Sequence, residues 1–506
     1  MIIDMYFQGQ HNNNAKTTGK WSKFVAFLVL FSTVVLFSPE ASGQRTVIKD
    51  KNKNSRVILS DKNVYRSTRS SLGNNFNIEY KGDIEINDTD TDVTSISPGG
   101  YLEISKTTFG SKRAIVIEPR GGTLKRQYYE GRKEVEWNPD GKEWLAEILP
   151  DVVRSTGFAA ESRVNRYFKK GGVDAVLDEV SRLESDYVRS IYGKLLLDKD
   201  ELTVNQLAKS IEELSDEISS DYYLAQMLKD NSSKFLKQEK TAEAYFSAVR
   251  NISSDYYATV VLKKSLERYT PTATTLVKIM EASRDIDSDY YQASLLSEVL
   301  ELEKLDGPMI AEIIETTKDI SSDYYQSQIL KKAMDLDNLS SESFEELIEA
   351  ISDVSSDYYM ASVFSSLLDN ELDNDVQKKI IILVDDKMSS DHYASSILSK
   401  MLEEQDLDDE AAERLMEAVG DINSSHYASS ILKKAASRDD LSKFTVLALI
   451  KSVEDMDSDY YKSQALQELA PHVRKSDDSD LRKAYRSAAD QIRSDTYYGR
   501  AIRAID

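Results

Sequence analysis

The chain has 506 residues, of which 41% are apolar and 30% charged, and it contains no cysteine. This length exceeds one ordinary domain, and the composition excludes a disordered chain and a disulfide scaffold. Of the formal net charge of -23, residues 151–506 alone contribute about -26, from 43 basic and 69 acidic side chains. This acidic region lacks the Lys/Arg-rich stripes that bind nucleic acids or anionic membranes. We therefore expect neither a nucleic acid nor a membrane surface as its partner. A basic protein partner is compatible with this charge.

Residues 1–43 are predicted to be an export signal. Three lysines precede the apolar run Phe24–Phe37, and Pro39 and the small residues Ala41–Gly43 follow it, a pattern typical of cleavage before Gln44. The fourteen-residue run is short for a membrane span, which needs about 20 residues. An uncleaved anchor remains the alternative, because a long polar segment precedes the run. We therefore expect an exported protein of the periplasm or cell envelope, with no membrane contact beyond this segment.

Residues 44–75 are rich in Lys, Arg, Asn and Ser and hold only short apolar islands, so they are predicted to be a flexible linker. Residues 76–140 contain short alternating runs that are separated by turn signals such as Pro98–Gly100. This pattern predicts a small antiparallel β-meander domain with one covered face. The expected strands are 76–81, 83–87, 93–97, 101–107, 113–119, 123–130 and 133–137.

Residues 141–506 are predicted to form an α-solenoid, which makes the protein mainly α. After a helical stretch that begins near residue 142, near-copies of "ISSDYYQSQIL" (320–330) recur every 34 to 36 residues. A constant period of this kind is the signature of stacked repeats, each of which is an αα-hairpin here. With the acidic residue of "SDYY" taken as position zero, ten copies begin at Asp186, Asp221, Asp255, Asp289, Asp323, Asp357, Asp391, Ser425, Asp459 and Asp495.

Columns read down the ten copies predict a role for each position. The residue at minus two is expected to cap the first helix, and the acid at zero lies in the first turn, where the helix dipole favours it. The apolar residue at minus three is expected to pack against the second Tyr, at plus two, as a hydrophobic staple. The residues at plus six, plus seven, plus ten and plus eleven complete an apolar face of the helix, which we call the apolar arc. In the copy that begins at Asp323 these residues are Ile329, Leu330, Ala333 and Met334. The residue at plus four is small in every copy and predicts closely packed helices.

The first Tyr, at plus one, lies off the apolar arc and becomes His in two copies. One interpretation is a partly exposed aromatic that bridges neighbouring repeats, and the other is a ligand-binding row. The row of acids at position zero has two similar interpretations, dipole compensation or a cation-binding stripe. The candidate partner-binding residues are Tyr256, Tyr290, Tyr324, Tyr358, His392 and His426.

Motifs for catalysis and cofactor binding are missing from the sequence. It has four His residues and contains no His-Glu-x-x-His, Gly-x-Ser-x-Gly or P-loop pattern. Acidic loops at 88–92, 369–375 and 406–410 offer oxygen ligands, but they lack the central Gly and terminal Glu of an EF-hand. We expect no enzyme activity, no cofactor and no metal site. A hydrolase built on helical hairpins is the least favoured alternative.

Two family resemblances follow from these motifs. The 34-residue hairpins resemble tetratricopeptide repeats in architecture and period, although the Trp, Leu-Gly, Ala/Phe and Pro positions of that repeat are not matched. The β-segment 82–104, the helical stretch 171–180 and the SDYY units together resemble uncharacterised bacterial envelope proteins. Similar regions follow the membrane segments of BlaR1-type metallopeptidases, whose zinc-binding helix is missing here. The resemblance implies an envelope protein and brings no catalytic residue.

The sequence thus predicts a non-enzymatic protein of the bacterial cell envelope that binds a protein partner, possibly basic, on a helical-repeat surface. The main alternative is a regulatory or sensory module that is tethered to the membrane by an uncleaved N-terminal helix.

Overall fold

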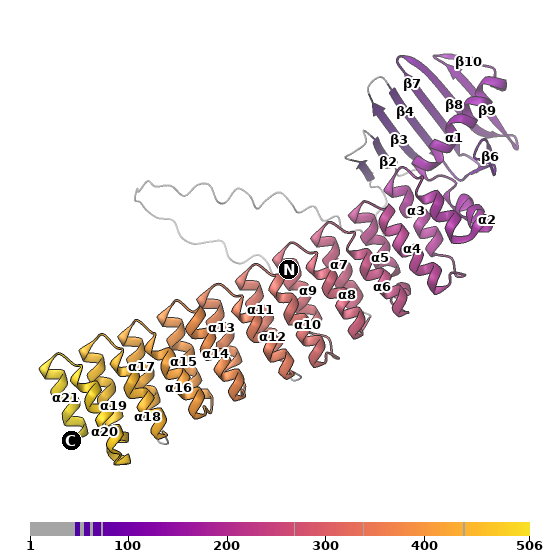
Figure 1. Ribbon diagram of the computed structural model, residues 1–506. Helices are drawn as coiled ribbons and strands as arrows, with labels where there is room; N and C mark the ends of the chain where they lie inside the picture. Colours follow the sequence, from indigo (N-terminus) through magenta and orange to yellow (C-terminus); the bar gives the residue numbers. More distant parts are fainter. Residues whose placement is uncertain are drawn as a thin grey trace, which may run out of the picture. The chain divides into compact units, whose positions relative to one another are not determined.

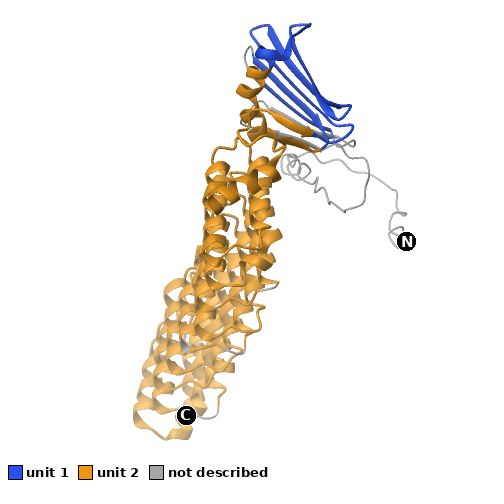
Figure 2. Cartoon of the chain, turned by 90° about the vertical axis from the view of Figure 1, so that its right-hand side faces the viewer, with its two compact units in different colours: residues 1–82, 96–141 blue, residues 83–95, 142–506 orange. Residues whose placement is uncertain are grey.

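The computed structural model describes residues 46–50, 55–60, 64–71, 74–267, 269–336, 339–438 and 441–506. Only the backbone is described for 46–50, 55–60, 71 and 341. The predicted export signal lies outside the described residues. The chain forms two compact units (Figure 2), the first comprising residues up to 82 and 96–141, and the second residues 83–95 and 142–506. The first unit is a β-domain and the second is a helical repeat array.

The β-domain is one antiparallel sheet of eight strands in the order β1-β2-β3-β4-β7-β8-β9-β10. Consecutive strands pair side by side, as a meander requires, and the excursion to β5 and β6 is the one insertion. Alternate side chains such as Leu102, Ile104, Ile115 and Ile117 are buried, which gives the sheet one apolar face. The strands are β1 (Thr46–Asp50), β2 (Ser55–Ser60), β3 (Val64–Ser71), β4 (Asn74–Lys81), β7 (Tyr101–Thr108), β8 (Ser111–Arg120), β9 (Thr123–Glu130) and β10 (Lys133–Val135).

The prediction of a flexible linker at residues 44–75 is wrong for most of the described residues in this range, because they form β-strands. Strands β1, β2 and β3 occupy part of it, and β3 pairs with β4 over eight residues, from Val64 opposite Lys81 to Ser71 opposite Asn74. Backbone pairing with a neighbouring strand stabilises these polar segments although they carry few apolar side chains. The β-domain therefore begins near residue 46 and not at 76.

The second unit begins with α1 (Lys142–Thr156) and α2 (Ala160–Val180), after the short η1 (Trp137–Gly141) of the first unit. The first helix of each repeat starts at position zero: α3 (Asp186–Leu197), α5 (Asp221–Phe235), α7 (Asp255–Leu266), α9 (Asp289–Val299), α11 (Asp323–Met334), α13 (Asp357–Leu367), α15 (Asp391–Glu404), α17 (Ser425–Ala436), α19 (Asp459–Ser476) and α21 (Asp495–Ile505). The second helices are α4 (Val204–Glu217), α6 (Glu239–Val249), α8 (Ala273–Arg284), α10 (Gly307–Thr316, followed by η2, Thr317–Asp319), α12 (Ser341–Ser352), α14 (Asn374–Lys387), α16 (Asp409–Gly420), α18 (Lys443–Glu454) and α20 (Ser479–Asp490).

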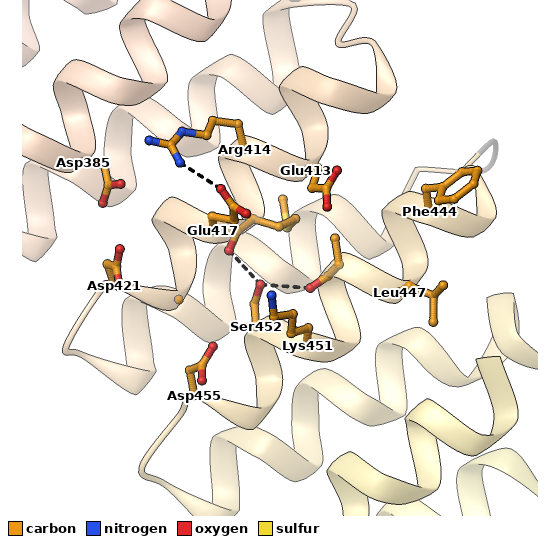
Figure 3. Close-up of a pocket in the computed structure, with 13 residues that line it drawn as sticks. Asp385, Glu413, Arg414, Glu417, Asp421, Phe444, Leu447, Lys451, Ser452 and Asp455 are labelled. Atoms are coloured by element: carbon orange, nitrogen blue, oxygen red, sulfur yellow. Dashed lines mark hydrogen bonds and ion pairs between the residues drawn. The ribbon is translucent and has the colours of Figure 1, made fainter. Parts of the chain in front are cut away.

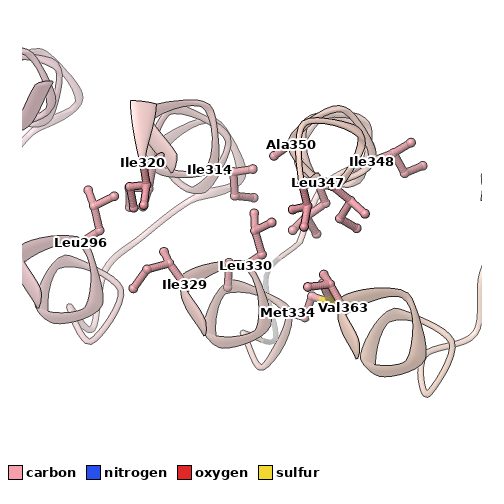
Figure 4. Close-up of a cluster of buried hydrophobic side chains, with 14 of the residues drawn as sticks. Leu296, Ile314, Ile320, Ile329, Leu330, Met334, Leu347, Ile348, Ala350 and Val363 are labelled. Carbon is pink, nitrogen blue, oxygen red and sulfur yellow. The ribbon is translucent and has the colours of Figure 1, made fainter. Parts of the chain in front are cut away.

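These helices confirm the predicted α-solenoid (Figure 1). Among the described residues it contains nine complete hairpins, because the tenth copy contributes only α21. Each first helix contacts the first helix of the next repeat, and each second helix contacts the next second helix, so the unit has two layers. The predicted apolar arc is buried between them. In Figure 4, Leu330 points toward Ile314 and Leu347, and Ile329 points toward Leu296. The predicted small column is buried in eight of the ten copies, with Ser327 fully enclosed, and is partly exposed at Ser190 and Gly499 in the first and last copies.

The predicted start of the first helices is wrong by one residue. In all ten copies the N-cap is the Ser at minus one, not the residue at minus two, and its side chain makes no cap hydrogen bond. The apolar residue at minus three is buried in every copy, whereas the second Tyr is only half-buried. The minus-three residue is therefore a core residue, and the second Tyr lies at the edge of the core.

A hairpin from the β-segment belongs to the helical unit. Strands β5 (Ile84–Ile86) and β6 (Val93–Ile96) pair with each other, and Asp90 between them accepts hydrogen bonds from Arg163 Nη2 at 2.8 Å and Arg166 Nη2 at 2.6 Å. Arg163 is fully buried and also donates to Glu179 at 2.8 Å. Burial acts to raise the pKa of Asp90, but the bonds and charges of the two arginines outweigh it and lower this pKa. The acidic loop 88–92 thus supplies a structural ion pair.

Within the part of the chain that the structure describes, no helix combines the length and the apolar character needed to cross a membrane.

Candidate functional site

In eight of the ten repeats, the aromatic residue at plus one is exposed, and together these residues form a row along the layer of first helices. We call this set the aromatic row. The exposed fractions of its tyrosines range from 40% for Tyr460 to 56% for Tyr290. Each member is the second residue of its helix, so the 34-residue period places all of them in register. The row consists of Tyr222, Tyr256, Tyr290, Tyr324, Tyr358, His392, His426 and Tyr460.

Each ring of the row contacts two half-buried rings, one in its own repeat and one in the next. Tyr324, for example, lies 5.1 Å from Tyr325 and 6.1 Å from Tyr359 between ring centroids, with interplanar angles of 67° at both contacts. Edge-to-face pairs of this kind stabilise a structure beyond the area that they bury. The same alternation runs from Tyr222 to Tyr497. The row therefore bridges adjacent repeats, as one interpretation of the sequence predicted.

The six candidate partner-binding residues all lie in this row and all are exposed. The structure brings them together on one face and adds Tyr222 and Tyr460, which the sequence prediction left out although they occupy the same column of the repeat. Their half-exposed rings leave one side free for a partner, so packing and binding are compatible roles. Binding by these residues stays a prediction.

A shallow hollow of about 370 Å³ opens beside the row between α9 and α11. Three tyrosines line it, together with uncharged polar residues such as Ser294 and Gln328 and three charged residues. The tyrosines are Tyr290, Tyr324 and Tyr325, and the charged residues are Lys263, Glu298 and Glu301. Ser294 and Gln328 lie one turn after Tyr290 and Tyr324, on the same helix face. Tyrosine, hydroxyl and amide side chains are among those that antibody paratopes use for protein recognition.

The acids at position zero lie in the first turn of their helices, as predicted, and they have a further role that the sequence did not suggest. Asp323 accepts hydrogen bonds from the backbone N–H groups of Ser355 at 3.1 Å and Ser356 at 2.9 Å, both in the next repeat. Equivalent bonds occur at eight consecutive junctions, from Asp221 to Asp459. At Ser425, where the acid is missing, the hydroxyl accepts instead. Each carboxylate thus holds the N-terminus of the following first helix, so its oxygens are committed to the protein backbone.

Lysines in the second half of the first helices donate hydrogen bonds to the first helices of neighbouring repeats. Lys331 Nζ donates to Ser362 of the next repeat, and Lys332 Nζ donates to Ser297 of the preceding repeat at 2.7 Å. Lys263 and Lys433 make forward contacts of the same kind. The polar residues that border the aromatic row therefore hold fixed positions.

Among the described residues, no group of three or more His, Asp or Glu side chains is arranged to hold a metal ion. The acidic loops 369–375 and 406–410 connect helices in this region, and Asp373 and Asp408 cap α14 and α16 by accepting backbone hydrogen bonds.

No protein-family model matches the chain, and no curated protein matches it. Among solved structures, the chain is similar to one described as "Computational Design of Self-Assembling Cyclic Protein Homooligomers", with 14% sequence identity over 66% of this chain and 94% of that chain. The TM-score of this match is 0.09. Because a score this low does not indicate a shared overall arrangement, no property of that design is transferred to this protein.

Proposed function

We propose that this protein is a non-enzymatic binding scaffold of the bacterial cell envelope, whose solenoid captures a protein partner along the aromatic row. The observation that carries the proposal is the row itself: eight aromatic side chains in register, half-exposed and rigidly supported. Rigid aromatic side chains supply large contact areas at a low entropic cost, and aromatic residues are enriched at protein interfaces.

Charge favours a basic partner. The region 151–506 has a formal charge of about -26, and opposite charges accelerate the encounter of two proteins. The envelope location is supported by the export-signal pattern of residues 1–43, in which the charged, apolar and small-residue segments follow in the usual order.

The test is capture of native envelope proteins by a variant in which the six candidate residues are changed. Because their rings also pack against neighbouring tyrosines, two versions are needed. The six residues Tyr256, Tyr290, Tyr324, Tyr358, His392 and His426 become Ala in one version and Met in the other, which retains apolar packing and removes the ring. We expect the Met version to melt somewhat lower than the wild type, because the ring pairs are lost, but to remain folded with the wild-type circular dichroism spectrum. It should lose capture of the partner that the wild type enriches.

The matched control changes exposed apolar residues of the second helices, Val204, Val277 and Ile382, to Ala. This control is expected to capture the partner normally. Full capture by a folded Met version, or equal loss in the control, would contradict binding at the aromatic row.

A further inference from the structure

Arginines on the second helices bridge consecutive repeats by a recurring ion pair. The residue five before position zero reaches the residue four before zero in the next repeat. Arg250 Nε lies 2.5 Å from Asp285 Oδ2, and Arg284 Nε lies 3.2 Å from Asp319 Oδ2. Asn251 and Asp216 make the same connection with exchanged roles at 2.9 Å. At the two arginine junctions, the acid at minus four accepts from the guanidinium of the preceding repeat.

Among the described repeats, the arginine–acid pair is confined to these two junctions, and Lys318 at the next one pairs with glutamates instead. Two junctions nearer the C-terminal end keep the acid at minus four but have no basic residue opposite it. The position that holds Arg250 and Arg284 in earlier repeats holds Asp386 and Gly420 here, while the acids at minus four are kept as Asp421 and Asp455. Gly420 lies directly beside the second of these acids, because a Cβ added to Gly420 would come within 3.1 Å of Asp455 Oδ2. Within the described part of the chain, Asp421 and Asp455 form no ion pair with a basic side chain.

A hollow of about 470 Å³ lies at this position, between α14, α16 and α18 (Figure 3). At one end Asp385 and Asp421 lie close together, with Asp455 below them. At the other end Phe444 and Leu447 supply an apolar wall, and Phe444 is 69% exposed. The hollow therefore combines an acidic end with an apolar end.

The charges around the hollow are unbalanced. Five carboxylates line it, those of Asp385, Glu413, Glu417, Asp421 and Asp455, against the two basic groups of Arg414 and Lys451. Arg414 Nη1 is already paired with Glu417 Oε2 at 2.9 Å. Burial raises the pKa of Asp385, and the nearby charge of Asp421 raises it further. Such mutual repulsion between carboxylates is relieved when a cation lies between them.

We propose that this hollow, the arginine socket, binds an arginine side chain of a partner protein, with an adjacent apolar side chain against Phe444. The guanidinium occupies the space that Arg250 and Arg284 fill at earlier junctions and pairs with Asp421 and Asp455. The fork of donors on a guanidinium matches carboxylates better than a lysine ammonium does. The socket lies on the layer of second helices and does not depend on the aromatic row, so either site can be tested without the other.

The test uses the full-length protein and a fluorescein-labelled peptide with three copies of the sequence RSLG. The control peptide carries neutral citrulline in place of each arginine. Binding is titrated by fluorescence anisotropy at about 0.15 M salt, where exposed long-range charge effects are largely screened. Three variants are compared with the wild type: the double change Asp421→Asn with Asp455→Asn, the single change Gly420→Arg, and the control double change Asp335→Asn with Glu371→Gln. The control removes the same number of charges from exposed positions outside the socket.

We expect the wild type to bind the arginine peptide at least about tenfold more tightly than the citrulline peptide, a tenfold change in Kd being a clear loss of one charged contact. Both socket variants should lose this preference, Gly420→Arg because its own guanidinium fills the site, and the control should keep it. Equal weakening in the control would show attraction to the overall charge and overturn the socket. An unchanged preference in Gly420→Arg, with a wild-type circular dichroism spectrum, would overturn it as well.

Discussion

The two layers of the solenoid are built by different rules. The first helices repeat nearly the same residues in most copies. At eight junctions, from α5 to α21, they are joined by equivalent contacts: an oxygen acceptor at position zero bonds to the next backbone, and a ring at plus one contacts the next ring. The second helices vary in sequence. Eight of the nine described are capped by their own Ser, Thr or Asp side chain, as Asp408 caps α16, and their ion pairs change from junction to junction.

This difference indicates that the two layers have different structural roles. Stacking in a solenoid depends on nearest-neighbour contacts, so a layer in which every junction is the same sets a regular rise from repeat to repeat. The other layer, whose helices carry their own caps, is free to differ locally. Uniform features such as the aromatic row therefore belong to the first layer, and a unique feature such as the arginine socket belongs to the second.

The largest expected effect concerns the rings of the first layer. Tyr325→Ala removes a half-buried ring that contacts Tyr324 and Tyr290, and we expect a loss of about 2–3 kcal/mol in the free energy of unfolding. Tyr324→Ala, which removes an exposed ring, should lose about 1 kcal/mol. Urea denaturation measures both. Equal losses would contradict the different environments of the two tyrosines.

The next effect compares the helix caps of the two layers. Asp323→Ala leaves two backbone N–H groups of the next repeat without their charged acceptor and should cost about 2 kcal/mol. Asp408→Ala removes a local cap of α16 and should cost about 1 kcal/mol. If the second substitution proved the more damaging in urea denaturation, the cross-repeat bond would not be the stronger constraint.

A smaller effect, with the opposite sign, is expected where the first layer departs from its own pattern. Ser425→Asp restores a carboxylate at the one junction where a hydroxyl accepts from Asp457 and Ser458 at 3.2 and 3.3 Å. Charged acceptors bind more strongly than neutral ones, so the variant should gain about 0.5–1 kcal/mol in stability. A loss of stability, seen as a lower melting temperature, would mean that this junction has adapted to serine.

The smallest effect is expected on the surface of the second layer. Arg284→Ala breaks partly exposed ion pairs with Asp319 and Glu312, both at 3.2 Å, and such pairs contribute about 0.2–1 kcal/mol. The loss should shrink further in concentrated salt, which screens exposed charges. A loss as large as that of Asp323→Ala, measured in the same urea series, would remove the distinction between the layers.

The repeat was predictable from the sequence because its period, its apolar arc and its small column are local patterns that recur. Positions such as Leu330 and Ser327 are buried as those columns required. Strand β3 was missed because Val64–Ser71 alternates few apolar residues with Arg and Ser, and its order depends on pairing with β4. Such pairing is a contact between distant residues that composition does not reveal.

The roles of single polar residues were harder to predict for the same reason. The cap of each first helix was placed at minus two because Ser occupies both minus two and minus one in several copies, which makes the choice ambiguous from side chains alone. The carboxylate at position zero bonds to a backbone 32 or 33 residues later. The sequence did contain one indication that the residue at position zero accepts a hydrogen bond. The one copy without Asp at this position has Ser425, which can also accept a hydrogen bond.

Site-specific photo-crosslinking tests the central claim, binding at the aromatic row, most directly. Benzoylphenylalanine is placed at position 324 in the row and, in a second protein, at position 277, an exposed apolar site on the second-helix layer. Both proteins are irradiated in native envelope fractions, and the crosslinked products are identified by mass spectrometry. The account predicts that one protein, rich in Lys and Arg, is crosslinked at position 324 and not at 277. Crosslinking of that protein at 277 alone, or none at 324, would contradict a partner-binding role for the row.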